Sequence, residues 1–321
     1  MTGTPLIYRA FAAEFQAQTG AVFRFVNTIP AVSAGRFKAA AGLAVTFSST
    51  SHVRPEPQPT TLTVRGLARD TIDRIVGGFE IARNLSFTQR QQLRAGRLRI
   101  IAGYRDNYAL ICDHEIIKVR YDRMNDTLTL EAQDGRVPWE NSFVVETLPG
   151  GADLSLVQDV LQQASNAGLQ SDEDFKNALL QKLPEYQAAS GNVRGKRETG
   201  YVLLGPTKRA ARRLNDTLGI RQFRQGGRLV TVSANAATLD RAVVLAPNRG
   251  RTSLERMERG FVRVESLMIP QLFAGRQVLL QSNEGLPEEG GVFRVDEAVF
   301  AGDYLGDSWG VTCRLRPTAL G

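Results

Sequence analysis

Two aspartates near the C-terminal end of the sequence have types and spacing that could do chemistry. Asp303 and Asp307 lie in the stretch AGDYLGDSW, four residues apart and each directly after a glycine. Paired carboxylates can bind a metal ion or share acid and base roles. An EF-hand loop counted from Asp303 would need a glutamate at position 12, where the sequence has Arg314. The glycines are typical of a chain reversal with positive φ, so we interpret the stretch as a turn between strands.

The run CDHE at 112–115 holds a thiol, two carboxylates and an imidazole. On a strand, alternate side chains point to opposite faces, so Cys112 and His114 would face one side while Asp113 and Glu115 face the other. The four groups cannot converge on one site. We therefore expect His114 to be a surface histidine near a hairpin and not a catalytic one.

Other sites of catalysis or ligand binding are not predicted. The run SGNVRGKRE at 190–198 fails as a phosphate-binding loop, because Ser190 replaces the first glycine and Arg197 replaces the hydroxyl that would hold magnesium. The sequence has only two histidines and two cysteines, without a C-x-x-C pair or an H-E-x-x-H motif. It predicts reduced, buried thiols at Cys112 and Cys313, with no metal, no cofactor and no enzymatic activity.

The positive charge of the chain is concentrated in one segment. Residues 194–228 hold ten basic and two acidic side chains, a local charge of +8, whereas the whole chain carries +7 and its remainder therefore −1. Aromatic residues for base stacking are sparse there, with only Tyr201 and Phe223. We favour a solvated helix face, or one packed on an acidic partner, over phosphate binding. The candidate contacts to phosphate or to an acidic partner are Lys208, Arg209, Arg212 and Arg213.

The length of 321 residues and the hydrophobic content of 42% suffice for two or three domains, each with its own core. No stretch has the roughly 18 to 20 uncharged apolar residues of a membrane-spanning helix, and the first residues lack the pattern of a signal peptide. We expect a soluble, unexported protein without a membrane anchor.

The first part of the chain predicts strands around one short helix. Residues 43–66 hold two alternating runs on either side of Pro55, Pro57 and Pro59, which we expect to mark a loop. A short helical pattern follows, with Asp70 or Thr71 as its cap and a break at 77–78, where two glycines stand. Residues 97–134 alternate with period two and predict an antiparallel meander, with turns at 105–107 and 124–126 and an end at 134–135.

The middle and the end of the chain predict a helical module and then further strands. Residues 153–187 have helical spacing, 205–219 predict a short helix between Pro206 and Gly219, and 220–233 predict a hairpin with Gly226-Gly227 at its turn. Four strands are predicted at 261–268, 276–283, 292–300 and 309–317. The predicted class is α+β, mainly β: two small antiparallel β-barrel domains, 1–140 and 241–321, with an α/β helix-plus-hairpin module at 141–240.

The C-terminal third carries an ordered series of motifs. It contains G-x-V-R-V-x-S-L-x-x-P-x-L-x-x-G-x-x-V-x-L-x-S at 260–282, then VFRV at 292–295, then a G-D turn and Trp309. This order resembles the hub proteins of bacteriophage baseplates and tail tips. The segments IIAGYRDNYALICDHEIIKVRYD and TLTLEAQDG are similar to the first tube-like barrel of that family, and 200–233 fits its small α/β module. The chain departs from the family at Phe300-Ala301, where members often have a histidine, and at His114, where they have glycine.

The resemblance implies a structural role. Such hubs form homotrimers in which two tube-like barrels per subunit make a pseudo-sixfold ring, and this ring adapts a hexameric tail tube to a trimeric central spike. The implied partners are a tail tube or distal tube protein, the spike, the tape-measure protein and baseplate wedge proteins, with DNA only passing through the channel. The implied location is the virion tail, assembled in the host cytoplasm. The alternatives are a nucleic-acid-binding module that uses 194–228 and a carboxylate hydrolase that uses Asp303 and Asp307.

Overall fold

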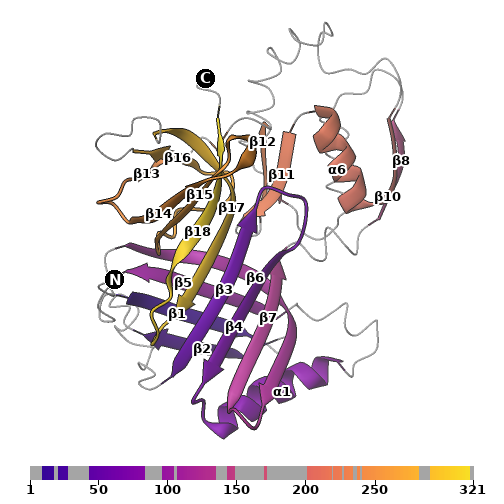
Figure 1. Cartoon of the computed structure of the whole chain (residues 1–321). Helices are drawn as coiled ribbons and strands as arrows, with labels where there is room; N and C mark the ends of the chain where they lie inside the picture. Colours follow the sequence, from indigo (N-terminus) through magenta and orange to yellow (C-terminus); the bar gives the residue numbers. More distant parts are fainter. Residues whose placement is uncertain are drawn as a thin grey trace, which may run out of the picture. The chain divides into compact units, whose positions relative to one another are not determined.

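The contacts of the chain divide into two compact units. Unit 1 comprises Met1–His52, Gln58–Asp134 and Leu239–Gly321, and unit 2 comprises Val53–Pro57 and Gly135–Thr238. Strands predominate in both, so the mainly β, antiparallel class predicted from the sequence is confirmed (Figure 1). The computed structural model describes residues 9–17, 21–27, 43–83, 96–104, 107–134, 143–148, 170–171, 201–218, 220–225, 228–233, 237–238, 241–281 and 290–318.

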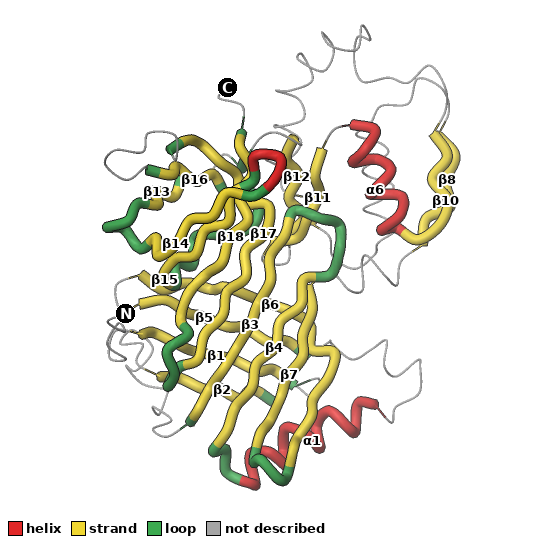
Figure 2. The backbone as a smooth tube through the Cα atoms, in the orientation of Figure 1, coloured by secondary structure: helices red, strands yellow, loops and turns green. Residues whose placement is uncertain are grey.

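Unit 1 is built on one continuous sheet with the strand order β14-β15-β18-β17-β3-β4-β7-β6-β5-β1-β2 (Figure 2). Strand β13 joins it through a parallel pairing with β16, which pairs with β17. The pairing of β3 with β17 unites the strands from both ends of the sequence in this sheet. The strands are β1 (Arg9–Gln16), β2 (Val22–Asn27), β3 (Ala44–His52), β4 (Gln58–Arg65), β5 (Arg97–Tyr104), β6 (Asn107–Asp122), β7 (Thr127–Asp134), β13 (Val243–Leu245), β14 (Arg251–Arg256), β15 (Val262–Leu267), β16 (Gln277–Leu280), β17 (Gly291–Asp303) and β18 (Trp309–Pro317).

Two long strands change partners along their length. The first half of β6 pairs with β5 and its second half with β7, with register shifts opposite Ile100 and after Ile116. Strand β17 likewise pairs with β16 at its start and with β3 at its end, with a shift between Val295 and Glu297. A bulge bends a strand and increases its twist, so the sheet can turn a corner at each of these strands.

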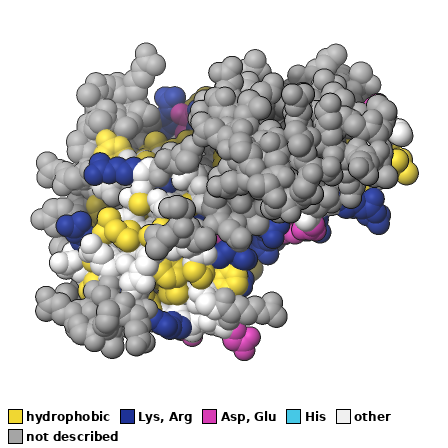
Figure 3. All heavy atoms as spheres, turned by 90° about the horizontal axis from the view of Figure 1, so that it is seen from above, with side chains coloured by type: hydrophobic (Ala, Val, Ile, Leu, Met, Phe, Trp, Pro, Cys, Tyr) yellow, Lys and Arg dark blue, Asp and Glu magenta, His cyan; other side chains and the backbone are white. Residues whose placement is uncertain are grey.

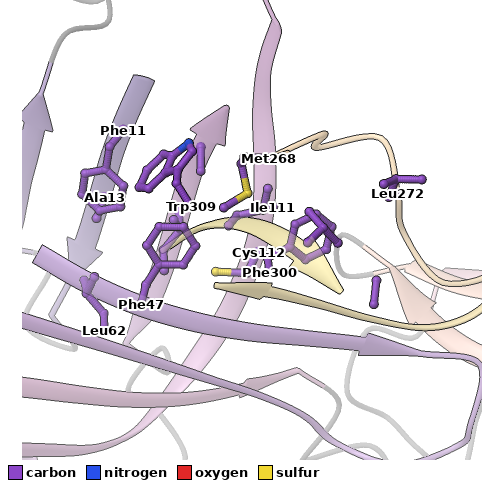
Figure 4. Close-up of a cluster of buried hydrophobic side chains, with 14 of the residues drawn as sticks. Phe11, Ala13, Phe47, Leu62, Ile111, Cys112, Met268, Leu272, Phe300 and Trp309 are labelled. Atoms are coloured by element: carbon purple, nitrogen blue, oxygen red, sulfur yellow. The ribbon is translucent and has the colours of Figure 1, made fainter. Parts of the chain in front are cut away.

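The turned sheet covers the main hydrophobic core of unit 1. Phe11 on β1, Phe47 on β3 and Trp309 on β18 are buried together (Figure 4). The rings of Phe11 and Phe47 stack with centroids 5.6 Å apart, and Trp309 meets Phe47 edge-on at 5.5 Å. Such aromatic pairs add about 0.5–1.5 kcal/mol each beyond the burial of their surface. The core therefore includes side chains from both ends of the sequence.

The β6–β7 turn confirms the turn predicted at 124–126. The Asp122 carboxylate accepts hydrogen bonds from the backbone N–H of Met124 (2.9 Å) and the side-chain amide of Asn125 (2.6 Å). The hydrogen bond from Asn125 is the main reason why the pKa of Asp122 lies below its usual value, and the bond from Met124 adds to the effect. Asp126 has a φ of 47°, a conformation that Asp and Asn tolerate better than most residues.

The prediction that Pro59 belongs to a loop is wrong. Pro59 is the second residue of β4 and lies opposite Gln133 of β7. The pairing of β4 with β3 extends only to Thr60, so Pro59 lies just beyond the end of that ladder. A proline is tolerated near the start of a strand, where its missing N–H is not needed by a second neighbour.

The helix predicted near residue 70 is longer than expected. Helix α1 spans Arg69–Arg83 and continues through Gly77 and Gly78, so the predicted break is wrong. It also begins before the predicted caps, since Ile72 N–H already donates to Ala68 O at 3.1 Å. The buried side chains of Ile72 and Ile75 hold the helix on the core, and this packing outweighs the weak helical propensity of glycine. None of the helices in the described ranges is long and apolar enough to cross a membrane.

The two cysteines of unit 1 are buried and free, as the sequence predicts. Burial raises the pKa of Cys112 and of Cys313 to about 12 from the ordinary value of 9.0. At pH 8 only about one thiol in ten thousand is then a thiolate. The native protein should therefore resist iodoacetamide at that pH, and both thiols should react once denaturant is added.

The same pKa shifts predict how stability depends on pH. Above pH 9.0 the unfolded chain loses the thiol protons that the folded chain keeps until about 12, so the free energy of unfolding should fall as pH rises through this window. The matched control is the Cys112→Ala/Cys313→Ala variant, which should lose stability more slowly over the same range. If the free energy of unfolding falls equally fast with pH in the two proteins, the two thiols are not the cause of the pH dependence.

Unit 2 contains a helix between two small groups of strands. Strand β8 (Phe143–Leu148) pairs with β10 (Tyr201–Pro206), and helix α6 (Thr207–Leu218) follows β10. Strands β11 (Ile220–Gln225) and β12 (Arg228–Ser233) form the predicted hairpin, and β9 (Gln170–Ser171) pairs with β12 in parallel. The order of helix and hairpin is thus confirmed. The helical spacing predicted at 153–187 lies almost entirely outside the described residues.

Candidate phosphate or acidic-partner site

Helix α6 carries the four basic residues singled out in the sequence. Ala210 and Ala211 are buried at 3% and 1% exposure, and these small side chains hold one face of the helix against unit 2. On the other face Arg209, Arg212 and Arg213 are exposed, while Lys208 is half-buried. The structure therefore brings the four predicted side chains together on one helix, as the 3.6-residue period requires.

The charges of α6 are not arranged to stabilise the helix itself. Lys208 and Arg209 lie in the first turn, which contains no acidic residue. A helix N-terminus carries a partial positive charge, so a cation there is unfavourable by about 0.3–1 kcal/mol. An anion bound beside this turn would remove the penalty. The arrangement is thus suited to a phosphate or to the carboxylates of an acidic partner.

Arg212 differs from its three neighbours because it has a partner within unit 2. Its guanidinium donates to the carboxylate of Glu56, in the segment Val53–Pro57 that connects β3 to β4. Across the described ranges, no carboxylate lies within ion-pair distance of Lys208, Arg209 or Arg213. These three residues are therefore the ones available to an external anion.

Basic side chains also lie outside helix α6. Figure 3 shows described Lys and Arg side chains at several separate places on one face. In unit 1 many are paired across strands in an ion-pair ladder, in which Glu14 lies between Arg24 (2.7 Å) and Arg99 (3.3 Å). Asp113 continues the ladder with contacts to Arg99 (3.3 Å) and Arg97 (3.0 Å). Exposed pairs of this kind contribute little stability but neutralise the face that carries them.

The stretch AGDYLGDSW is a turn between β17 and β18, as predicted. The Asp303 carboxylate accepts hydrogen bonds from the N–H groups of Leu305 (3.1 Å) and Gly306 (2.9 Å). Asp307 makes no comparable contact in the described structure, and the two carboxylates do not form a common site. Within the described ranges no group of three or more His, Cys, Asp or Glu residues could hold a metal ion.

The reason for the glycines in this turn differs from the prediction. Neither Gly302 nor Gly306 has a positive φ, so the expected left-handed conformation is wrong. A Cβ on Gly302 would lie 2.5 Å from Phe47 Cε1 and 2.7 Å from Trp309 Cε3, both in the core. A Cβ on Gly306 would lie 2.5 Å from Asp303 Oδ2. Space, and not backbone conformation, therefore requires glycine at 302, whereas a side chain at 306 would push against the Asp303 carboxylate.

The prediction that His114 is a surface residue is wrong. Its side chain is buried at 5% exposure, and Nδ1 lies 2.8 Å from the Thr60 hydroxyl, which is itself 2.7 Å from the Ser49 hydroxyl. The strand alternation is nevertheless as expected, since Cys112 is also buried while Asp113 and Glu115 lie on the other face. Cys112 and His114 are therefore part of the buried structure, whereas Asp113 faces outward and pairs with Arg97 and Arg99. The phosphate-loop-like run at 190–198 lies outside the described residues.

Sequence reasoning missed a buried cation that has several partners. Arg9 is 4% exposed, and its guanidinium lies 5.5 Å from the centre of the Trp309 ring. It donates to the backbone oxygens of Asp303 (2.9 Å), Tyr304 (3.4 Å) and Gly306. Arg9 thus fixes the β17–β18 turn from the opposite end of the sequence. No local pattern could have indicated this, because the partners are backbone atoms about three hundred residues away.

The arrangement of strands is shared with solved tail proteins. The 43 kDa tail protein of prophage MuSo2 from Shewanella oneidensis superposes with a TM-score of 0.56 over 96% of this chain and 98% of its own, at 9% identity. A tail protein from Neisseria meningitidis MC58 gives a TM-score of 0.54 over 96% of each chain, at 8% identity. The chain has the fold of a phage tail protein. The tail-protein fold expected from the sequence resemblance is therefore confirmed.

A third structure extends this comparison to a secretion system. The E. coli c3393 protein has a TM-score of 0.54 at 8% identity, covering 86% of this chain and 74% of its own. It is described as a component of the type VI secretion system, with structural similarity to the T4 bacteriophage tail proteins gp27 and gp5. No protein-family model and no curated protein matches the sequence itself. At such low identities, common architecture is preserved by patterning and packing with little agreement in individual residues.

Proposed function

We propose that this protein is the structural hub of a phage tail baseplate or tail tip. In this role it is a homotrimer that joins the hexameric tail tube to the trimeric central spike. The observation that carries the proposal is the tail-protein fold, which extends over 96% of the chain in two of the compared structures. A mainly β body with one shared core suits a rigid load-bearing part, and it needs no reaction to perform this role.

The proposal includes the arrangement of the subunit. Residues 1–140 and 241–321 form two tube-like barrel domains and 141–240 form the α/β module between them. Three subunits with two such domains each present six similar elements, which matches a sixfold tube on one side and a threefold spike on the other. A heterologous contact that closes after three copies produces this symmetry. Tape-measure and baseplate wedge proteins are further partners, and DNA passes through the channel.

An image of assembled particles tests this proposal directly. The tail should be isolated with a small epitope label on this subunit, and the density at the tail axis should be reconstructed by electron cryomicroscopy without imposed symmetry. Three labelled copies around the axis, between tube and spike, are expected. Any other number of copies per axis, or a position away from the tail, would exclude the hub role.

A second function, nucleic-acid binding by α6, is favoured by one observation. The cations in its first turn are unfavourable for the helix and are matched to an anion. The test is filter binding of duplex DNA to the purified protein at two salt concentrations. If Lys208, Arg209 and Arg213 each contact a phosphate, their replacement by Gln should reduce the slope of log K against log salt by about 2.7, or 0.9 per contact.

The variants are chosen to distinguish a specific binding site on α6 from non-specific electrostatic attraction. Arg212 is left unchanged because it pairs with Glu56. The control replaces three exposed arginines elsewhere, Arg123, Arg249 and Arg256, and so removes the same net charge. Equal effects of the two triple variants would show non-specific attraction. If the affinity of the wild-type protein for DNA does not depend on salt, DNA binding by α6 is excluded. An acidic protein would then be the expected partner of this helix.

A further inference from the structure

The two-stranded sheet of unit 2 has one face that is both apolar and exposed. Side chains on β8 and β10 alternate between two faces, and residues directly opposite each other share a face. The one charged residue of the two strands, Glu146, lies opposite Leu203 on the inner face. Four large hydrophobic side chains of the outer face are exposed by 59–68%. The outer face consists of the opposed pairs Phe143 and Pro206, Val145 and Leu204, and Thr147 and Val202.

The inner face of the same sheet is covered by one helix. Val144 and Leu203 are buried at 2% and 3% exposure, and α6 contacts both strands (Figure 1). Helix α6 has 12 residues and is therefore about 18 Å long, while strands of six residues extend over about 20 Å. One helix of about three turns thus suffices to cover one face of this sheet. The outer face has the same length and width, so it also fits a single helix.

The exposed hydrophobic residues of unit 1 do not complement the outer face. In the described ranges they lie singly on different elements, such as Val22 on β2, Leu110 on β6 and Leu279 on β16. Single exposed residues are ordinary, whereas a contiguous apolar face marks an interaction site. Two strands about 4.8 Å apart give the outer face roughly 20 by 10 Å, far less than the roughly 800 Å² that each partner of a stable complex buries. A second copy of this chain, which carries +7, is therefore a poor occupant.

Cations lie at one end of the outer face. Pro206 is the last residue of β10, and Lys208 and Arg209 follow it in the first turn of α6, which contains no acidic residue. Consecutive Cα atoms are 3.8 Å apart, so the Cα atoms of Pro206 and Arg209 are at most about 11 Å apart. An occupant that extends beyond Pro206 meets positive charge that this helix does not balance. Acidic residues are therefore favoured at that end of the occupant.

We infer that the outer face binds an acidic, amphipathic helix of another protein in the assembled tail, an inference that rests on the tail location in the proposed function. Such a helix presents apolar residues at positions i, i+3, i+4 and i+7 to the face and carries carboxylates at the end nearest Lys208 and Arg209. The small face is sufficient for a partner that is already held in the same particle, because its effective concentration is high. A nucleic acid is disfavoured, since the six residues offer its phosphates no cation.

A photo-cross-linking side chain at position 143 tests the inference in assembled tails. Benzoylphenylalanine replaces Phe143, the tails are isolated and irradiated, and the cross-linked peptides are identified by mass spectrometry. The expected adduct joins position 143 to a segment of another tail protein that has net negative charge and helical apolar spacing. In this background Val145→Glu/Leu204→Glu should lower the yield of the adduct at least about tenfold, because docking would bury two carboxylates without partners.

The matched control for this substitution adds the same charge elsewhere. Thr252→Glu/Ser253→Glu places two carboxylates at exposed positions of β14 in unit 1. This variant should keep the yield of the adduct within about twofold of the tails without added charge. An equal loss in both variants would mean that negative charge in general, and not the outer face, controls the yield, and would overturn the inference.

The identity of the adduct decides between the possible occupants. An adduct with this chain itself, an adduct with a segment that lacks helical spacing or net negative charge, and the absence of any protein adduct would each overturn the inference. If the variants do not assemble tails, the reconstruction of wild-type tails decides, since helical density of another protein either covers the outer face or does not. Tails that lack this subunit altogether refute the proposed function itself, so the two failures are distinguishable.

Discussion

Replacing Arg9 with methionine is expected to reduce the free energy of unfolding by about 3 kcal/mol or more. Methionine keeps much of the apolar stem but removes the charged donors to the backbone oxygens of Asp303 and Tyr304. Hydrogen bonds from a charged group contribute about 1.5–3 kcal/mol each, and a buried acceptor left without its partner adds a further penalty. Contact with the face of the Trp309 ring is lost as well. Urea unfolding followed by tryptophan fluorescence measures the change.

The matched control for this variant is Arg99→Met. Arg99 lies on β5 with its side chain 43% exposed, and it forms ion pairs with Glu14 and Asp113 in the ladder. Exposed pairs are worth about 0–1 kcal/mol, so this variant should unfold close to wild type. Similar losses in the two variants would mean that Arg9 acts only as one more surface cation, in contradiction to its burial.

Replacing Gly302 with alanine is expected to destabilise the protein by about 2–3 kcal/mol, although only one methyl group is added. The new Cβ would lie 2.5 Å from a ring carbon of Phe47 and 2.7 Å from two ring carbons of Trp309. Both rings are packed within the core and cannot move without displacing Phe11. Overpacking of this kind typically costs about 1–3 kcal/mol. The measurement is the shift of the denaturant midpoint at constant m-value.

Gly77→Ala adds the same methyl group as Gly302→Ala, but it is expected to raise the free energy of unfolding and not to lower it. No atom lies within 4 Å of a Cβ built on Gly77, which is in the middle of α1. Alanine is favoured over glycine in a helix by about 1 kcal/mol, so this variant should be stabilised. Asp307→Asn completes the set and should change little, because that side chain does not organise the turn. A larger effect at Asp307 than at Gly302 would revive a functional role for the carboxylates.

The local elements of this fold could be predicted from sequence because their signals are local. The Asn/Asp turn at 124–126 and the helix at 207–218, which lies between Pro206 and Gly219, each depend on residues that are close neighbours in the chain. The burial of Cys112 could also be predicted, because a free cysteine is usually buried. Where a residue type and its immediate neighbours determine the structure, the sequence is enough.

The errors have a common physical origin in tertiary packing. Gly77 and Gly78 weaken a helix in isolation, but the burial of Ile72 and Ile75 holds α1 together across them. His114 looked like a surface residue because its partner Thr60 comes from another strand. The site on α6 was predicted as a group, whereas the pairing of Arg212 with Glu56 depends on a loop 156 residues away. Distant partners of this kind leave no trace in local composition.

The bonds of Arg9 to the β17–β18 turn also constrain when the protein can fold. Arg9 and Asp303 are separated by 294 residues. At a synthesis rate of about 5–20 residues per second, roughly 15–60 s pass between their appearance at the ribosome. During that interval β1 and β3 lack the aromatic neighbour Trp309, and β3 lacks its partner strand β17. The core of unit 1 is therefore completed only after synthesis of its last strand, so folding of this body is a late event in the life of the nascent chain.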